Sequence, residues 1–424
     1  MLLKRIQKVF SFIPFLSQSL RPGLTGNIFF LIISLAMITF IAQSGLIDNR
    51  QYSELEPVKE ESTPAFTDDE IYFFQDTITQ YLLNRQFNGS VLLARNGTVL
   101  VSRSFGFADF RSHAPLTQET PFQLASISKT FTAAAVLLLQ DQGRLSIDDP
   151  VADHIQEFPY PQITVRMLLN HTSGLQNYMW LVERYWRQPH PPTNEDMLRL
   201  FNTYPRPLDF RSGTRFAYSN TGYAFLGLLI ERVSGQRFPH FMQTQIFDPL
   251  DMPNTWVYDL HNDNPAKTDR VFGFRSWGRG HIVIPDVDHD GVFGDKGIYS
   301  NVLDLYTWDR AISGGKLLSE TVWHQAFDYT RLGNNRPVNY GLGWRLQTFL
   351  DKRVVHHPGR WNGFRTSFKR FIEDDATLIL LSNTNRDITP LINGLQNILF
   401  HKEIAALSQP PAEDPDVYDE LGGQ

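Results

Sequence analysis

The chain contains no cysteine among its 424 residues. Disulfide bridges, thiolate nucleophiles and metal or iron–sulfur sites held by cysteine are therefore excluded. A basic block is also missing, because 39 lysines and arginines stand against 45 aspartates and glutamates, a net charge of −6. This balance argues against nucleic acid as the main partner. Hydrophobic residues make up 42 % of the chain, which is enough for a sizeable core in one large domain or two ordinary ones.

One long apolar run stands near the N-terminus. Residues 28–47, IFFLIISLAMITFIAQSGLI, carry no charge and have the length of a helix that spans a bilayer. Basic residues precede the run and acidic residues dominate after it. The positive-inside rule therefore predicts that residues 1–27 are cytoplasmic, that 28–47 are a transmembrane anchor, and that the chain after about residue 48 lies outside the cytoplasm.

Two other interpretations of this run are weaker. A cleaved signal peptide is disfavoured because the preceding segment is long and no A-x-A site follows, although Ala42 and Ser44 are small enough for a peptidase. A buried helix of a soluble protein leaves the charge asymmetry unexplained.

The rest of the chain divides by composition. Residues 48–66 are polar, acidic and proline-containing and are typical of a linker, whereas residues 407–424 form an acidic tail that we predict to be disordered. Between them, residues 67–406 are predicted to form one domain. Its elements are a helix over 67–85, two strands joined at Asn96–Gly97, a helix-rich middle past 150, late strands over 341–349, 352–359, 365–373 and 376–383, and a final amphipathic helix over 388–403.

Strands at both ends of the domain, with helices between them, predict an α+β fold. The expected architecture is sandwich-like: one antiparallel sheet built from both chain ends, flanked by helices and carrying a helical insertion.

The segment FQLASISKTFTAAAVLLLQ, residues 122–140, places Lys129 one turn after Ser126 in an otherwise apolar run. We expect a helix that starts at Ser126, with its free N–H groups and positive dipole end next to the serine Oγ. Lys129 lies on the same face and takes the hydroxyl proton only as a neutral amine. Lowering its pKa from about 10.4 to near neutrality costs roughly 4 kcal/mol, which burial supplies.

Ser-x-x-Lys alone is a weak signal, since Ser313 and Lys316 repeat it in a glycine-rich turn. Further motifs are needed. Tyr218-Ser-Asn220 stands just before another apolar helix, and His357-Pro-Gly359 stands where a late strand meets an open glycine backbone. Tyr299-Ser-Asn301 is a second match to the tyrosine motif.

These motifs, in this order, resemble the serine β-lactamase-related hydrolases, which include class C β-lactamases, penicillin-binding DD-carboxypeptidases, D-aminopeptidases and esterases. The resemblance covers roughly residues 70–400 and gives Tyr218, not Tyr299, the functional position. It extends to the segments LSIDDPV, ITVRMLLNHTSGL, SNTGYAFLGLLIERVSG, FDPLDMPNTW, GDKGIYS, YGLGW and HPGRWNGF.

The resemblance implies a β-lactamase/transpeptidase-like fold and a mechanism. Ser126 attacks a carbonyl to form an acyl-enzyme, while Lys129 and Tyr218 share the proton transfers. Asn220 binds the substrate amide or steadies Lys129. The backbone N–H groups of Ser126 and Arg360 form the oxyanion hole, worth about 3 kcal/mol. No metal or organic cofactor is required.

The third motif departs from the family, because His357 stands where β-lactamases and most penicillin-binding relatives carry lysine. An imidazole that is mostly neutral replaces an ammonium that binds a substrate carboxylate. This favours peptide, D-amino-acid or ester substrates, some of the kind that a cell wall supplies, over β-lactams. Arg360 and Arg365 are candidates for the missing charge.

The leading interpretation is thus a serine hydrolase at the bacterial inner membrane, single-pass, with its catalytic domain periplasmic or extracellular. A penicillin-binding sensor that is acylated without turnover is the alternative, and a dead scaffold is disfavoured by the complete motif set. We interpret His171 as structural. The aromatic residues within 178–186 are expected either to line the pocket or to pack between helices. Asp286, Asp288 and Asp290 match half of a calcium loop, but Gly297 replaces the required glutamate, so a plain turn is preferred.

Overall fold

The computed structural model describes residues 66–262, 270–278 and 280–403, all within the unit that begins at Ala65. The predicted cytoplasmic segment, the anchor at 28–47, the linker up to residue 65 and the tail at 407–424 lie outside the described residues. Within the described part of the chain, no helix is long and apolar enough to cross a membrane.

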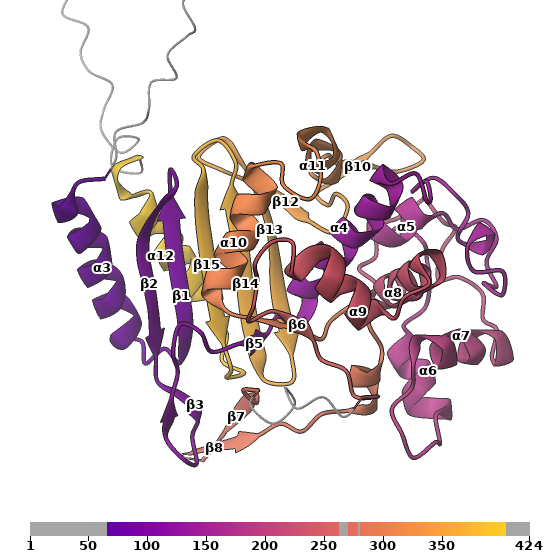
Figure 1. Cartoon of the computed structure of the whole chain (residues 1–424), viewed down its shortest axis with the longest axis horizontal. Helices are drawn as coiled ribbons and strands as arrows, with labels where there is room; N and C mark the ends of the chain where they lie inside the picture. Colours follow the sequence, from indigo (N-terminus) through magenta and orange to yellow (C-terminus); the bar gives the residue numbers. More distant parts are fainter. Residues whose placement is uncertain (1–65, 263–269, 279, 404–424) are drawn as a thin grey trace, which may run out of the picture. The chain divides into compact units, whose positions relative to one another are not determined.

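A six-stranded antiparallel sheet forms the centre of the domain, in the order β12-β13-β14-β15-β1-β2 (Figure 1). The first two strands of the sheet in the chain pair with the last four, which confirms the prediction of one sheet from both chain ends. The strands are β1 (Gly89–Arg95), β2 (Thr98–Phe105), β12 (Arg345–Phe349), β13 (Lys352–Trp361), β14 (Phe364–Phe371) and β15 (Ala376–Ser382).

Helices cover both faces of this sheet. On one face, α3 (Asp68–Leu83) and α12 (Thr389–Leu399) pack on a core that includes Val91 and Leu380. A capping box between Thr67 and Glu70 begins α3, so that the N-terminal N–H groups are satisfied by local side chains. Because side chains alternate along a strand, the neighbouring strand residues face the larger core under α4 (Ser128–Asp141) and α10 (Val302–Ser313).

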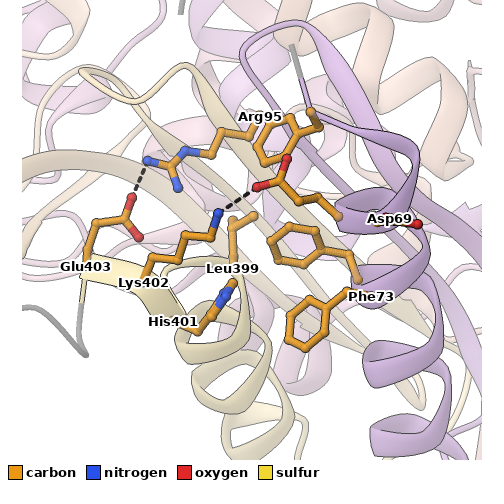
Figure 2. A pocket seen from close by; sticks show the side chains of 10 residues that line it. Asp69, Phe73, Arg95, Leu399, His401, Lys402 and Glu403 are labelled. Carbon is orange, nitrogen blue, oxygen red and sulfur yellow. Dashed lines mark hydrogen bonds and ion pairs between the residues drawn. The ribbon is translucent and has the colours of Figure 1, made fainter. Parts of the chain in front are cut away.

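The ends of α3 and α12 meet at a cavity of about 220 Å³ (Figure 2). Lys402 bonds Glu70 at 2.6 Å, and Arg95 of β1 bonds Glu403 at 2.6 Å. These pairs tie the segment after α12 to α3 and to β1. The cavity is lined by Phe66 and the first turns of α3, by Arg95, by Leu399 at the end of α12 and by His401, Lys402 and Glu403 after it, and none of the residues predicted for the site is among them.

The helical insertion predicted past residue 150 is present and packs on α4. Its helices are α5 (Val165–Leu169), α6 (Tyr178–Tyr185), α7 (Asn194–Thr203), α8 (Asn220–Ser234) and α9 (Phe238–Met242). A three-stranded sheet in the order β5-β9-β6 links the insertion to the chain before α4. Its strands are β5 (Phe122–Gln123), β9 (Ile298–Ser300) and β6 (Trp256–Val257).

Several short elements complete the described chain. They are β3 (Phe107–Asp109), β4 (Ala114–Pro115), β7 (Phe274–Trp277), β8 (Gly280–Val283), α11 (Glu320–Ala326), β10 (Thr330–Arg331) and β11 (Pro337–Val338).

The start of the Ser126 helix differs from the prediction. Ala125–Ile127 form a 3₁₀ turn, and the α-helix α4 begins only at Ser128. Ala125 has φ of 52°, a left-handed conformation that costs a residue with a side chain about 1–3 kcal/mol and that persists only where the surroundings impose it. Here the chain leaves β5 and turns sharply into the helix, and the packed turn sets the position of Ser126.

Candidate active site

Ser126 is the one residue between Phe122 and Leu137 that is not buried. Its neighbours belong to the core under the sheet, including Leu124, Ile127 and Phe131. The 3₁₀ turn therefore holds a serine hydroxyl at the surface of an otherwise closed, rigid element. Such a position suits a nucleophile, which must reach substrate without moving.

Lys129 is completely buried, and its amine touches the serine. Its Nζ donates to Ser126 Oγ at 3.2 Å and to the backbone carbonyl of Asp295 at 2.6 Å. Burial lowers the pKa of Lys129 to about 8; the Asp295 carboxylate opposes this shift and the Arg345 charge adds to it. An amine with this pKa is neutral in a useful fraction of molecules near neutral pH.

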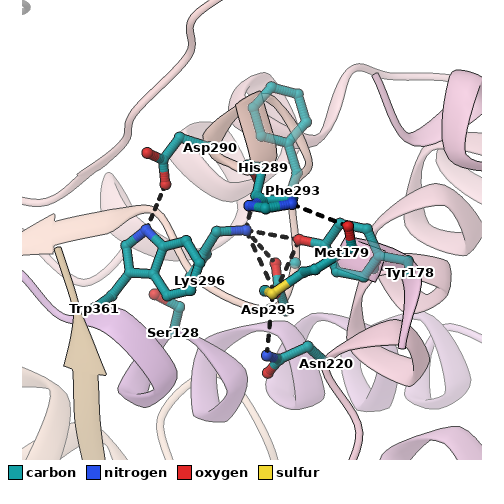
Figure 3. Close-up of polar contacts among 12 residues, drawn as sticks. Ser128, Tyr178, Met179, Asn220, His289, Asp290, Phe293, Asp295, Lys296 and Trp361 are labelled. Atoms are coloured by element: carbon teal, nitrogen blue, oxygen red, sulfur yellow. Dashed lines mark hydrogen bonds and ion pairs between the residues drawn. The ribbon is translucent and has the colours of Figure 1, made fainter. Parts of the chain in front are cut away.

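The Asp295 carbonyl is held in place by a buried network around Lys296 (Figure 3). Lys296 Nζ donates to Tyr178 Oη at 2.7 Å, to the His289 carbonyl at 2.7 Å and to Asp295 Oδ1 at 3.2 Å. Tyr178 Oη in turn donates to Asp295 Oδ2 at 3.2 Å. The Asp295 carboxylate is thus paired with Lys296, and only its backbone oxygen contacts Lys129.

Tyr218 lies directly before α8 and beside the amine. Lys129 Nζ is 5.1 Å from the centre of its ring. Burial raises the pKa of Tyr218, and the nearby Ser126 hydroxyl and Arg345 charge oppose this shift only in part, so the group is a neutral phenol at physiological pH. Its buried hydroxyl has no hydrogen-bond partner of good geometry. A buried hydroxyl left unpaired costs about 1–3 kcal/mol, a cost that a substrate group removes when it binds there.

Asn220 opens α8 two residues after Tyr218. Its side-chain amide makes only a weak contact, Nδ2 to Met179 Sδ at 4.0 Å (Figure 3). Ser219, not Asn220, caps the helix by accepting from the Gly222 N–H. The amide of Asn220 is therefore available to a substrate.

Gly359 lies where β13 touches the 3₁₀ turn of Ser126. A Cβ at this position would overlap the Thr366 hydroxyl and the Leu124 carbonyl oxygen and would press on Ala125. Thr366, its partner across the sheet, donates to the same Leu124 carbonyl at 2.8 Å. Only glycine lets the strand approach the turn this closely.

The hairpin between β12 and β13 sets the direction of the Arg360 N–H. Its two loop residues, Leu350 and Asp351, have φ of 50° and 60°, as a type I′ turn requires. In such a hairpin the two residues next to the turn, Phe349 and Lys352, exchange hydrogen bonds, and every second pair along the strands does the same. The even-numbered residues of β13 therefore point their N–H groups toward β12. β12 begins at Arg345, which lies opposite His356, so no residue of β12 pairs with Arg360. The Arg360 N–H therefore points to an open sheet edge beside the Gly359 contact, as an oxyanion donor must.

Pro358 lies two residues before Arg360, so its backbone nitrogen faces the same edge of the sheet, but proline carries no N–H group. At an open edge this costs the sheet no hydrogen bond. The proline is thus compatible with β13 because β12 is too short to pair with it.

His357 sits at the end of a hydrogen-bond chain whose directions are fixed. The Ser219 N–H donates to His171 Nδ1 at 3.2 Å, so His171 carries its proton on Nε2 and donates it to Tyr340 Oη at 2.9 Å. His357 Nδ1 donates to the Pro358 carbonyl at 2.8 Å, so its Nε2 accepts from Tyr340 Oη at 3.3 Å. Burial and the nearby Lys129 charge also hold the pKa of His357 well below its usual range. His357 is therefore a neutral, fixed imidazole.

The second copies of the motifs lie elsewhere. Ser313 ends α10, and its hydroxyl donates to the Asp309 carbonyl, while Lys316 is exposed. Tyr299 lies in β9, and its hydroxyl accepts from Arg270 at 2.9 Å. Neither contacts Ser126 or Lys129 through any hydrogen bond of the described residues.

The aspartates of the calcium-like stretch have other partners. Asp286 accepts from Arg270 and Tyr258, while Asp290 accepts from Trp361 Nε1 and from Asn362. Within residues 66–262, 270–278 and 280–403, no three acidic or histidine side chains converge as metal ligands. Asp290 instead ties the segment before β9 to the end of β13.

Sequence reasoning missed part of the site. Asp295, Tyr340 and Arg345 were not predicted as site residues, whereas His171 was expected to be structural and lies in the hydrogen-bond chain that ends at His357. The signals were present, since Asp295 lies in GDKGIYS, Tyr340 begins YGLGW and His171 lies in NHTSGL. A segment match does not say which side chain of the segment points at the nucleophile.

A family model described as Beta-lactamase matches residues 74–401, so the chain belongs to the β-lactamase family and is a serine hydrolase of that kind. Penicillin-binding protein 4* of Bacillus subtilis is 36 % identical over 329 residues, which cover 74 % of this chain and 73 % of that protein. A D-aminopeptidase of Brucella anthropi is 26 % identical over 336 residues, which cover 77 % of this chain and 60 % of the relative.

Solved structures share the fold. FmtA from Staphylococcus aureus superposes with a TM-score of 0.68 at 22 % identity, covering 84 % of this chain and 96 % of FmtA. The D-amino acid amidase from Ochrobactrum anthropi superposes with a TM-score of 0.64 at 22 % identity, covering 80 % of this chain and all of the amidase chain. Together with the sheet order, they confirm the predicted β-lactamase/transpeptidase-like α+β fold.

Proposed function

We propose that this protein hydrolyses amide, peptide or ester bonds through a covalent acyl-enzyme on Ser126. One observation carries the proposal: a fully buried lysine amine, which pairs with no carboxylate among the described residues, lies 3.2 Å from a serine hydroxyl at the surface. A buried lysine without a carboxylate partner is costly, and general-base activation of the serine is the function that this cost supports.

Acylation starts with the neutral amine of Lys129. It takes the proton of Ser126 Oγ while Oγ bonds to the substrate carbonyl carbon. Tyr218 is unsuited to this step because burial keeps it protonated. The oxyanion that forms accepts hydrogen bonds from the backbone N–H groups of Ser126 and Arg360, and Asn220 binds the substrate amide.

Collapse of the tetrahedral intermediate breaks the carbonyl–nitrogen or carbonyl–oxygen bond. The Tyr218 phenol gives its proton to the leaving atom and recovers one from the Lys129 ammonium, so the amine becomes neutral again. Water then attacks the acyl-enzyme and gives its proton to Lys129. The ester bond breaks, the acid leaves, and the Lys129 ammonium returns that proton to Ser126 Oγ, so that both groups regain their starting states. The chain of His171, Tyr340 and His357 holds the wall of the site rigid during both steps.

The substrate class is supported by the relatives and by the third motif. A D-aminopeptidase and a D-amino acid amidase are among the similar proteins, and both names describe amide cleavage. His357 is a neutral, fixed imidazole at the position where β-lactam-binding relatives carry an ammonium, so the positive charge expected of a β-lactam-binding site is missing there. We therefore assign short peptides, amides and esters, including those with D-residues, as substrates.

We also propose that the enzyme is anchored in the bacterial inner membrane by residues 28–47, with the hydrolase domain outside the cytoplasm. The uncharged run and the charge asymmetry around it support this placement. Cell fractionation tests it: the full chain is expected with membranes, a chain without residues 1–47 in the soluble fraction, and added protease is expected to reach the domain of the full chain in spheroplasts. A full chain that stays soluble would contradict the anchor.

Intact-mass measurement of the full chain tests the nucleophile. A fluorophosphonate and, separately, a penicillin are added to the wild type, to Ser126→Ala and to the matched control Ser313→Ala. An adduct is expected in the wild type and in Ser313→Ala and is expected to be absent in Ser126→Ala. A penicillin adduct that persists without turnover of any amide or ester would favour the sensor function instead. No adduct on a folded wild-type chain would overturn the proposal.

A further inference from the structure

A second buried lysine, Lys296, lies next to the site and takes no part in the proposed proton transfers. It is 3 % exposed. An ammonium has three N–H donors, and here the Tyr178 hydroxyl, the His289 carbonyl and the Asp295 carboxylate accept all three (Figure 3). A buried cation with a complete set of partners is held in one place, so its charge acts on its neighbours from a fixed position.

Asp295 lies between this lysine and the proposed base. Its backbone carbonyl accepts from Lys129 Nζ at 2.6 Å, while its buried carboxylate pairs with Lys296 Nζ at 3.2 Å. Burial and the Asp295 charge raise the pKa of Tyr178, so the Tyr178 hydroxyl keeps its proton and donates it to the second carboxylate oxygen at 3.2 Å. The two ends of one residue thus bind two different amines.

The partner of an amine decides whether the amine can act as a base. A carboxylate in contact with a lysine stabilises the ammonium, whereas a carbonyl has no net charge and accepts an N–H from the amine as well. With one N–H of Lys129 directed to the Asp295 carbonyl, the lone pair of the neutral amine is free to face Ser126 Oγ at 3.2 Å. The Asp295 carboxylate would prevent this if it turned to Lys129, and Lys296 is the cation that holds it away.

Most titratable groups that face Lys129 are neutral. Burial raises the pKa of Tyr218 and of Tyr223 and lowers the pKa of His171 and of His357. Two charged groups act on Lys129 from outside its own helix, the Asp295 carboxylate and the Arg345 guanidinium. Of these two, only the carboxylate favours the protonated amine, so its position controls the base.

The groups that face Lys296 come from three segments. Tyr178 belongs to α6 and Asp295 precedes Lys296 in the chain. His289 presents its carbonyl to Lys296 and its Nε2 to the Met179 carbonyl and to Glu183. The Asp290 carboxylate also feels the Lys296 charge, but it accepts from Trp361 and Asn362. Asp295 is therefore the carboxylate that Lys296 binds directly.

We propose that Lys296 is a positioning residue for the reaction: by holding the Asp295 carboxylate, it leaves Lys129 with an uncharged hydrogen-bond partner and a lone pair for Ser126. The assignment rests on the proposed function, since it takes Lys129 as the base. It deepens that function, because Tyr178, Asp295 and Lys296 then set the protonation state of Lys129 without contacting the reacting atoms.

The pH dependence of fluorophosphonate labelling tests this role in the full chain. The labelling rate of Ser126, followed by intact mass, should have a midpoint in the wild type near the Lys129 pKa of about 8. In Lys296→Met the carboxylate has lost its cation and is drawn to Lys129, so the midpoint should rise by about one pH unit or more. Labelling at neutral pH should then fall about tenfold or more, while the rate at high pH should be nearly retained.

Asp295→Asn makes the opposite electrostatic change in nearly the same shape. Burial lowers the pKa of Lys129 and the Asp295 charge opposes this shift, so without that charge the midpoint should fall below that of the wild type. The double variant, Asp295→Asn with Lys296→Met, removes both charges and should return the midpoint close to the wild-type value. A purely structural role for the pair would slow labelling without moving the midpoint in opposite directions.

Lys352→Met is the matched control, because it breaks a lysine–aspartate pair, Lys352 with Asp374 at 2.6 Å, at the other end of β13. Its midpoint should equal that of the wild type, and circular dichroism verifies that each variant is folded. A midpoint that does not fall in Asp295→Asn would overturn the assignment alone, even if Lys296→Met does not fold. No Ser126 adduct in the wild type at any pH would overturn the proposed function and the assignment with it.

Discussion

Two buried lysines on opposite faces of the central sheet have nearly the same pKa and different surroundings. Lys129 belongs to α4, and its Nζ lies 5.6 Å from the centre of the Tyr223 ring of α8. Lys369 of β14 faces α12, where its Nζ donates to Gln396 Oε1 at 2.8 Å. Burial lowers the pKa of each to about 8. Lys129 has a serine hydroxyl at 3.2 Å, whereas Lys369 has an amide oxygen and no hydroxyl.

The comparison separates a shifted pKa from a catalytic group. Desolvation acts on both amines alike, so a lowered pKa by itself does not mark a base. What differs is the neighbour: the 3₁₀ turn presents Ser126 to Lys129 at the surface, while Lys369 is enclosed between the sheet and a helix. The chemistry therefore depends on which face of the sheet holds the nucleophile.

Removing each amine gives the largest expected contrast. Lys129→Met should lower kcat/KM for an N-acyl-D-alanyl thioester by about 10³-fold, because Ser126 loses its general base. Lys369→Met should leave kcat/KM within about threefold, because no reacting atom contacts Lys369. Steady-state kinetics, with circular dichroism to verify folding, makes the measurement. Comparable losses in both variants would contradict the distinction between the two lysines.

The next prediction concerns the close contact between Gly359 of the sheet and the turn that carries Ser126. Gly359→Ala should lower kcat/KM by about 10²-fold, because the new Cβ overlaps Leu124 and displaces the turn that positions Ser126. Gly280→Ala is the control, since the nearest atom to a Cβ there is the Trp277 carbonyl oxygen at 3.9 Å. The rate of fluorophosphonate labelling reports the geometry directly. Wild-type labelling in Gly359→Ala would show that the turn is not held by this contact.

The pH dependence should follow Lys129 alone. Because the neutral amine is the base, kcat/KM should rise about tenfold per pH unit below pH 8 and level off above it. Lys369→Met should not move the midpoint. Arg345→Gln should move it upward, because the Arg345 charge lowers the pKa of Lys129. A pH–rate profile from pH 6 to 10 decides this, and activity that increases toward acid would exclude Lys129 as the base.

The smallest effect is expected at the hydrogen-bond chain. Tyr340→Phe leaves His171 Nε2 and His357 Nε2 unpaired in a buried place, which should lower stability by about 1–3 kcal/mol and kcat/KM by only a few-fold. Tyr329→Phe, at an exposed position, is the control. Urea unfolding and thioester kinetics together make the test. A loss as large as that of Lys129→Met would mean that the chain takes part in proton transfer.

Much of the fold was predictable because its signals are local. Asn96 and Gly97 have the positive φ values that their hairpin needs, and Thr67 and Glu70 form a capping box within four residues. Ser126 and Lys129 lie one turn apart, so their contact needs little besides the turn itself. The membrane anchor at 28–47 stays a prediction, since those residues lie outside the described structure.

Other features depend on contacts between distant segments. The 3₁₀ turn before α4 was missed because the left-handed φ of Ala125 is imposed by packing and not by its own preference. Placing the Arg360 and Arg365 side chains on the face away from Ser126 requires the register of β13, because a shift of one residue exchanges the faces of a strand.

The sequence by itself determined the α+β sheet from both chain ends, the proximity of Ser126 and Lys129, and the absence of a lysine from the third motif. Periodicity, turn chemistry and ordered motifs act over short distances and can be read along the chain. Only the tertiary structure decided that the Asp295 carbonyl accepts a hydrogen bond from Lys129, that Tyr340 joins His171 to His357, and that Arg345 lies beside the Tyr218 ring. Those contacts join residues far apart in the chain, so packing and strand register select them.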